Sequence, residues 1–315
     1  MAVSNETRVT EFILLGLSSD PDLQIVFFVQ FLVMYLLAIT GNLLIIIAIY
    51  VDSQLHIPMY FLLSNLSFID LSFATVTVPK FLVNFLEQSR TINFSDCIAQ
   101  VFFIHLLGGT ECFQLGLMAY DRYVAICNPL RYTTIMNRRA CLLLVVSIWT
   151  AGFVHAFTQV FPSTLLTFCG PNEIDHFFCD VLPLSFLACS STFVTDTLAM
   201  INSGLIALSC FLVVSISYAY IISSVLKIRS AEGRQKTFST CASHILVVTL
   251  FFGPSVFIYL RPSVTFSGDK MVAVFYAIVT PVLNPCIYTL RNKKVKRAMK
   301  KLGSRNVSFL KKQIK

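Results

Sequence analysis

Seven runs of mostly apolar residues, each of roughly 20 or more, restrict the fold of this 315-residue chain more than any other feature. Each run is long enough for a helix to cross the hydrocarbon core of a bilayer. Backbone polar groups must be satisfied internally in lipid, and the alternation of membrane β-strands is absent, so the runs should be helices. The sequence therefore predicts an all-α membrane protein, a seven-transmembrane helix bundle with spans at about 25–49, 58–80, 97–124, 141–161, 197–226, 238–260 and 270–290.

The composition agrees with this prediction. Apolar residues make up 56% of the chain, charged residues only 13%, and the mean hydropathy is +0.75. A soluble protein of this length needs more charge to cover its surface. Without repeats or low-complexity segments, we expect a polar N-terminal segment over 1–24, one transmembrane domain over 25–290, and a tail over 291–315 that begins with a short amphipathic helix at about 292–302. No basic region precedes the first apolar run, so we expect no cleavable signal peptide.

The basic residues predict an orientation. If the N-terminus is extracellular, 19 of the 24 lysines and arginines face the cytoplasm. Only Arg8, Lys80, Arg90, Arg261 and Lys270 then lie outside. Such a bias places the N-terminus outside and the C-terminus in the cytoplasm. The net charge of +8 then sits against anionic lipid, which argues against a nucleic-acid partner. The sequon Asn5-Glu6-Thr7 lies on the outer side, so Asn5 is a predicted glycosylation site.

The end of the third span carries the most informative segment, Met-Ala-Tyr-Asp-Arg-Tyr-Val-Ala-Ile-Cys-Asn-Pro-Leu-Arg-Tyr over 118–132. Asp121 beside Arg122 can form an ion pair in one state and release Arg122 to a cytoplasmic partner in another. An isolated Asp-Arg pair at a helix end would indicate only a solvated pair. Fifteen residues in this order resemble the end of the third span in rhodopsin-like receptors, in the extended form typical of odorant receptors.

Further segments extend the resemblance over about residues 10–302. They are Gly41-Asn42, Leu-His-Ile-Pro-Met-Tyr-Phe-Leu-Leu-Ser-Asn-Leu-Ser-Phe-Ile-Asp over 55–70, Ser217-Tyr218, Lys-Thr-Phe-Ser-Thr-Cys-Ala-Ser-His over 236–244, and Pro-Val-Leu-Asn-Pro-Cys-Ile-Tyr-Thr-Leu-Arg-Asn over 281–292. The chain is similar to vertebrate odorant receptors of the larger, terrestrial-vertebrate class. Phe251, Pro254 and the pair His56-Ile57 depart from the commonest forms of the family.

The resemblance implies a function. An odorant would bind on the extracellular side of this plasma-membrane receptor and activate a stimulatory, cAMP-raising heterotrimeric G protein. Prolines such as Pro254 and Pro281 would supply bends in the moving helices. The coupling and switch residues it implies are Asp121, Arg122, Tyr123, Tyr218, His244, Asn284, Pro285 and Tyr288.

Two alternatives differ from this prediction. The same fold could sense metabolites outside the nose, since the sequence carries no mark of its tissue. A transporter or channel is disfavoured because internal repeats and broken helices are absent. We do not expect an enzyme, because neither a Ser/His/Asp set nor a His/Glu metal spacing is present.

Four cysteines fall on the predicted outer side: Cys97, Cys169, Cys179 and Cys189. Disulfides are permitted there, and the residues alone leave three pairings open. The resemblance implies Cys97–Cys179 and Cys169–Cys189. His176, Cys179 and Asp180 form a metal-like cluster, but a disulfide at Cys179 would remove the thiolate that a metal requires.

Two carboxylates, Asp70 and Glu111, fall in the middle of the membrane, where a charge is costly. The resemblance implies a sodium ion bound between them, and no other cofactor. The alternative is a polar cluster that shares a proton with Asn42 and Asn284.

We expect the ligand pocket between the outer halves of spans 3, 5, 6 and 7. On span 3, His105, Gly108, Gly109 and Cys112 follow the spacing i, i+3, i+4, i+7 and share one helix face. The resemblance supports similar choices on spans 5, 6 and 7, although each residue could instead serve plain interhelix packing. The span-3 face carries no acid, which disfavours amines, so a small, mostly apolar volatile molecule fits best. The predicted pocket residues are His105, Gly108, Gly109, Cys112, Asn202, Ser203, Ile206, Ala207, Phe251, Phe252, Ser255, Val256, Tyr259, Tyr276, Ala277 and Thr280.

Overall fold

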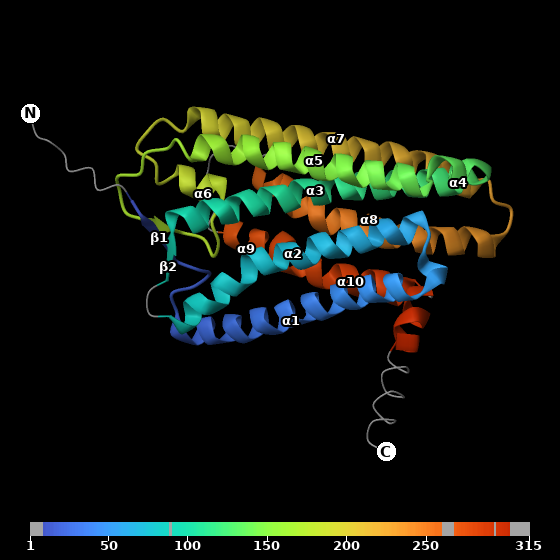
Figure 1. Cartoon of the computed structure of the whole chain (residues 1–315), viewed down its shortest axis with the longest axis horizontal. Coiled ribbons are helices and arrows are strands. Elements are labelled where there is room, and N and C mark those ends of the chain that lie inside the picture. Colours follow the sequence, from blue (N-terminus) through green and yellow to red (C-terminus); the bar gives the residue numbers. More distant parts are fainter. Residues whose placement is uncertain (1–8, 88–89, 260–267, 293, 303–315) are drawn as a thin grey trace, which may run out of the picture.

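The computed structural model describes residues 9–87, 90–259, 268–292 and 294–302. Within them, seven helices are long and apolar enough to cross a membrane, and they lie side by side in one elongated bundle (Figure 1). This confirms the predicted fold. The seven are α1 (Pro21–Val51), α2 (Pro58–Leu86), α3 (Phe94–Cys127), α5 (Arg138–Ser163), α7 (Phe193–Leu226), α8 (Ala231–Tyr259), and a last one that combines α9 (Asp269–Val274), a π-helical segment (Phe275–Val279) and α10 (Thr280–Arg291).

Most helices extend beyond the predicted spans because polar residues start or continue them. The carboxylate of Asp20 accepts hydrogen bonds from the backbone N–H groups of Asp22 and Leu23, so α1 begins at Pro21. The side chain of Asn137 caps α5 in the same way through Ala140. A hydropathy pattern detects only the apolar part of a helix that crosses the lipid, so it does not predict polar helix ends of this kind.

A small β-sheet closes one end of the bundle, here named the lid end. Strand β1 (Glu11–Leu14) lies between β2 (Thr91–Asn93), to which it is antiparallel, and β3 (Glu173–Ile174), to which it is parallel. In the register, Glu11 faces Asn93 and Ile13 faces Glu173. The short helix α6 (Val181–Ser185) follows β3. The sequence did not predict this sheet, because its strands are very short and come from three distant segments.

The opposite end, here named the basic end, holds the short helix α4 (Tyr132–Ile135), two 3-10 turns (Ser53–Leu55 and Pro129–Arg131), and a helix over 294–302. The 294–302 helix buries Val295 and Ala298 and exposes Lys294. It begins after Asn292, whose side-chain oxygen accepts from the N–H groups of Lys294 (3.1 Å) and Val295 (3.3 Å). The predicted amphipathic helix is therefore present.

Helix α3 runs through the middle of the bundle and packs against α2, α5, α7 and α8. Its contact with α5 is close at Gly152. A Cβ at Gly152 would collide with Thr110 Oγ1 and lie 3.0 Å from the carbonyl oxygen of Leu106. Only a residue without a side chain therefore fits between these two helices.

Gly152→Ala should lower the stability of the receptor by about 1–3 kcal/mol, because backbone atoms of α3 must move to admit the methyl group. Gly253→Ala is a matched control within a helix, since no atom lies within 4 Å of the added Cβ. There alanine should be neutral or stabilise the helix by about 0.5–1 kcal/mol. Thermal unfolding of the detergent-purified receptors measures both changes, and equal melting temperatures for the two variants would refute the close packing.

Candidate functional site

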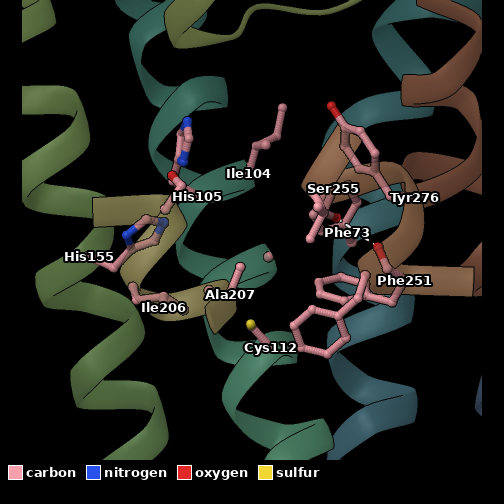
Figure 2. Close-up of a pocket in the computed structure, with 15 residues that line it drawn as sticks. Phe73, Ile104, His105, Cys112, His155, Ile206, Ala207, Phe251, Ser255 and Tyr276 are labelled. Carbon is pink, nitrogen blue, oxygen red and sulfur yellow. Dashed lines mark hydrogen bonds between the residues drawn. The ribbon is translucent and has the colours of Figure 1, made fainter. Parts of the chain in front are cut away.

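A cavity opens in the half of the bundle nearest the lid end, among α2, α3, α5, α7, α8 and the π-helical segment. The volume of the cavity that is open to the centre of a water molecule is about 80 Å³. A single water needs roughly 10–15 Å³ by this measure, so the cavity holds a small organic molecule and excludes a peptide. Figure 2 shows its residues. They are Phe73, Ile104, His105, Gly108, Gly109, Cys112, His155, Ser203, Ile206, Ala207, Phe251, Phe252, Ser255, Val256 and Tyr276.

Most of the predicted pocket residues line this cavity. All predicted residues on α3 and α8 whose side chains are described line the cavity. On α7 and the π-helical segment, Ser203, Ile206, Ala207 and Tyr276 line it as well. Tyr259 lies outside the described side chains. Three predicted residues, Asn202, Ala277 and Thr280, are not among the residues that line this cavity.

The three exceptions have local causes. Asn202 donates a 2.6 Å hydrogen bond to Thr158 Oγ1 on α5. A π-helical turn contains more residues than an α-helical turn, and here it directly precedes Thr280 and Pro281. Pro281 has no backbone N–H, so it cannot donate the hydrogen bond of a regular α-helix. Within this segment, Tyr276 lines the cavity while Ala277 and Thr280 do not. Ala277 is fully buried in the core, and the hydroxyl of Thr280 donates to the carbonyl of Phe275 at 3.0 Å.

Sequence reasoning missed Phe73 on α2, Ile104 on α3 and His155 on α5. Phe73 and Ile104 are indistinguishable from ordinary core residues in a sequence. His155 carried a signal, because it is a polar side chain in the middle of an apolar span.

The loop between α5 and α7, residues 164–192, here named the lid, is attached to α3 beside the cavity. The disulfide Cys97–Cys179 joins it to the start of α3, and Cys169–Cys189 closes the loop on itself. These are the two pairs that the resemblance implied. The N–H of Cys179 donates to Gln100 Oε1 at 2.8 Å, and Nε2 of the cavity residue His105 lies 3.1 Å from Asp180 Oδ1.

Two titratable groups of the lid are fully enclosed. Burial lowers the pKa of His176 to about 4, against the opposing effect of Asp180. Burial alone would raise the pKa of Asp180, but the hydrogen bond with His105 and the N–H of Val181 lower it. Among the described residues, no group of three or more His, Cys, Asp or Glu side chains is arranged to hold a metal.

A second polar site lies deeper in the bundle. Asn284 Nδ2 donates to both carboxylate oxygens of Asp70, at 3.1 and 3.0 Å. Asp70 and Glu111 are almost fully buried and interact electrostatically, while Glu111 Oε1 has no hydrogen-bond partner in the described part of the chain. The amide of Asn42 donates to the carbonyl of Pro281 at 3.0 Å, so Asn42 ties α1 to α10 instead of reaching the carboxylates.

At the basic end, three of the predicted switch residues, Tyr218, His244 and Tyr288, lie close enough to interact with the charge of Arg122. The hydroxyl of Tyr132 donates to Asp121 Oδ1 at 2.9 Å, and no ion pair between Asp121 and Arg122 occurs among the described residues. The hydroxyl of Tyr218 lies 2.9 Å from His244 Nδ1 and links α7 to α8. Tyr288 is buried within the same core cluster as Tyr218. The ring of Tyr123 packs against Tyr220 at the surface, and Pro285 lies within α10.

Comparisons with known proteins agree with this architecture. The profile of a family described as olfactory receptor matches residues 31–305. The chain is 54% identical to human olfactory receptor 4E2 over 98% of both chains, and 52% identical to human olfactory receptor 4S2 over 95% of this chain and 96% of that one.

A solved structure shows the same fold. The crystal structure of squid rhodopsin superposes with a TM-score of 0.70 at 16% identity, over 90% of this chain and 86% of that one. Together with the full-length relatives, the seven apolar helices make the protein a multi-pass plasma-membrane protein. The chain therefore belongs to the olfactory receptor family: it is a G-protein-coupled odorant receptor and not an enzyme.

Proposed function

We propose that this receptor binds a small, mostly apolar volatile molecule in the cavity of Figure 2 and activates a stimulatory, cAMP-raising G protein at the basic end. The observation that supports the ligand class most is the lining of the cavity. It is largely apolar and aromatic, with a few hydroxyl, thiol and imidazole groups, and no Asp, Glu, Lys or Arg is among its described residues. Such a lining favours an uncharged ligand of low polarity.

We propose that the lid end faces the extracellular side. The strong bias of lysine and arginine toward the basic end supports this orientation, and so do the disulfides of the lid, which need an oxidising compartment. The C-terminal segment over 291–315 is then cytoplasmic and Asn5, which lies outside the described residues, is a glycosylation site. Lys294 and its basic neighbours would contact anionic lipid of the inner leaflet.

Ligand binding changes the conformation of the basic end because some helices that line the cavity also extend to that end. Helix α8 contributes Phe251 and Phe252 to the cavity and His244 to the switch, and Pro254 lies inside the same helix. Pro254 weakens the hydrogen-bonding of this helix near the ligand. A ligand that binds better when α8 swings outward shifts the population toward that state. The separation of Tyr218 from His244 would then open a cleft for the C-terminus of the G-protein α-subunit beside Arg122.

The site formed by Asp70 and Glu111 suits a sodium ion. Both carboxylates are buried, and Glu111 Oε1 lacks a partner within the described residues, as expected for an oxygen that ligates a hard cation. A bound cation would neutralise the repulsion between the two carboxylates. Asp70 and Glu111 would hold it, with Asn284 fixing the orientation of Asp70. A cation there would favour the inactive packing.

Replacing sodium in the medium with N-methyl-D-glucamine should raise basal signalling or agonist potency about 5-fold, at the lower end of ordinary allosteric coupling. Glu111→Gln should abolish this sodium dependence because it removes one charged ligand. Glu87→Gln, at an exposed carboxylate that pairs with Lys80, serves as control and should retain it. An equal response of the wild type with and without sodium would exclude the ion.

The proposed function is tested by expressing the full-length receptor with a cAMP reporter and applying a chemically diverse odorant panel. At least one small, uncharged, mostly apolar compound should raise cAMP in a saturable manner, and mock-transfected cells should not respond. Activation by charged amines only, or a signal through a G protein that lowers cAMP, would contradict the proposal.

A further inference from the structure

The walls of the cavity differ in polarity. Figure 2 shows the two imidazoles of His105 and His155 on one side, and the mostly aromatic side chains Phe73, Phe251 and Tyr276, together with Ser255, on the other. A ligand with one polar group and an apolar body therefore has a preferred direction in the cavity. The polar end of the ligand belongs beside the histidines, where α3, α5 and α7 meet.

His155 is held in place by a close contact with α3. A Cβ at Gly109 would lie 2.7 Å from His155 Cδ2, so the ring occupies the space that any other residue at this position would fill. Its ring also packs edge-on against His105, with centroids 5.5 Å apart. His155 is only 7% exposed and Asn202 lies beside it, yet Nδ1 has no hydrogen-bond partner within the described residues.

This burial indicates how the imidazole carries its proton. An unpartnered buried N–H is rarer and costlier than an unpartnered acceptor. We therefore infer the neutral tautomer in which Nδ1 has no proton and Nε2 carries it. Nε2 is bonded to Cδ2, and Cδ2 is the ring atom that contacts the cavity residue Gly109. His155 then offers a donor at the boundary of the cavity.

Ser203 offers a second donor close to α5, the helix that carries His155. Gln159 Nε2 donates to Ser203 Oγ at 3.1 Å and occupies an acceptor position of the hydroxyl. Within the described residues, the hydroxyl hydrogen of Ser203 has no acceptor, and Ser203 lines the cavity. By contrast, the hydroxyl of Ser255 on the opposite side donates to the carbonyl of Phe251 at 2.8 Å.

We propose that the receptor prefers carbonyl odorants, small aldehydes or ketones, whose oxygen accepts hydrogen bonds from His155 and Ser203. A carbonyl oxygen has two lone pairs and no hydrogen, which matches two donors. An alcohol adds a donor of its own that then needs an acceptor, and a hydrocarbon leaves both protein donors unpaired. This inference rests on the proposed function, since it assigns a chemical class to the ligand of the same cavity.

The test applies matched probes on two carbon skeletons to full-length receptor in transfected cells. The first set is hexanal, 2-hexanone, 1-hexanol, hexylamine, hexanoic acid and hexane. The second is benzaldehyde, benzyl alcohol, benzylamine, benzoic acid and toluene. On at least one skeleton the carbonyl compound should be at least about 10-fold more potent than the matched alcohol and hydrocarbon. This difference corresponds to one well-formed hydrogen bond in a buried site.

Variants identify the residues involved. His155→Leu and Ser203→Ala should each weaken the carbonyl agonist about 10- to 100-fold and reduce the difference between carbonyl and alcohol. His155→Gln, which retains a donor near the position of Nε2, and Ser203→Thr, which retains the hydroxyl, should recover most of the potency. Val154→Ala changes the neighbouring residue that faces away from the bundle, is 56% exposed, and should have no effect. Surface labelling confirms equal expression.

The outcomes separate the two proposals. If alcohols, acids or amines activate the receptor and the carbonyl compounds do not, the carbonyl inference is wrong while the odorant cavity stands. Equal potency of wild type and His155→Leu toward a carbonyl agonist would also overturn it. If no probe of any class changes the signal of a receptor that reaches the surface, both the inference and the proposed function fail.

Discussion

Replacing Cys97 with serine is expected to remove about 4.5 kcal/mol of stability and to abolish most receptor at the cell surface. The disulfide Cys97–Cys179 spans 82 residues of sequence, so its loss frees a large loop in the unfolded chain. It also releases the lid from α3 at the point where the N–H of Cys179 binds Gln100. Because His105 contacts Asp180, next in sequence to Cys179, the cavity loses its cover as well.

Cys169→Ser is the matched comparison. The disulfide Cys169–Cys189 spans only 20 residues, for which the same loop-entropy relation gives about 3.3 kcal/mol. In surface labelling of tagged receptor, Cys97→Ser should give less receptor at the cell surface than Cys169→Ser. In thermal unfolding of purified protein, Cys97→Ser should have the lower melting temperature. The reverse order would mean that the bond within the loop, and not the bond to α3, holds the lid in place.

Arg122→Ala is expected to reduce agonist-driven G-protein activation at least about 10-fold without lowering the amount of folded receptor. Arg122 is 8% exposed at the basic end, and its charge interacts with Tyr218, His244 and Tyr288. Asp121 is engaged by Tyr132 in this structure, so Arg122 is not held by its neighbour and remains poised to meet an incoming partner. A hydrogen bond from a charged donor contributes about 1.5–3 kcal/mol, which corresponds to about 10- to 100-fold in coupling.

Arg131→Ala provides the control, since Arg131 is an exposed arginine near the same end. Its loss should leave the dose–response curve within about 2-fold of the wild type, as for most surface charges. Membranes with equal amounts of each variant, assayed for agonist-stimulated nucleotide exchange on the G protein, give the comparison. An Arg122→Ala receptor that couples as well as Arg131→Ala would disprove the role of Arg122.

The sequence predicted the seven helices well because hydropathy reports directly on burial in lipid. Helix ends depended on single polar side chains, such as Asp20 before α1, which hydropathy does not register. The sheet of the lid end was missed for a different reason. Its strands have two to four residues and pair across large sequence separations, as Ile13 does with Glu173, so no local period reveals them.

The cavity was predicted in part. The spacing of His105, Gly108 and Cys112 placed them on one face of α3 because that helix is regular. Ala277 and Thr280 were chosen from the resemblance, and they do not line the cavity, because the π-helical turn before Pro281 changes the register of the last helix. His155 was missed because the pocket was expected between spans 3, 5, 6 and 7, and His155 lies on the fourth span, α5. The space left by Gly109 allows its ring to reach the cavity.

Filling the cavity tests the central claim most directly. Gly108 lines the cavity, and a Cβ there would meet only Phe73 at 3.6 Å, an ordinary contact. Gly108→Leu should therefore fold, reach the surface and retain basal signalling, while its side chain occupies the space of the ligand. We predict that every agonist found in the odorant panel loses its effect on this variant, in a cell assay that measures G-protein activation at matched surface expression. A Gly108→Leu receptor whose dose–response curves match those of the wild type would show that odorants act elsewhere.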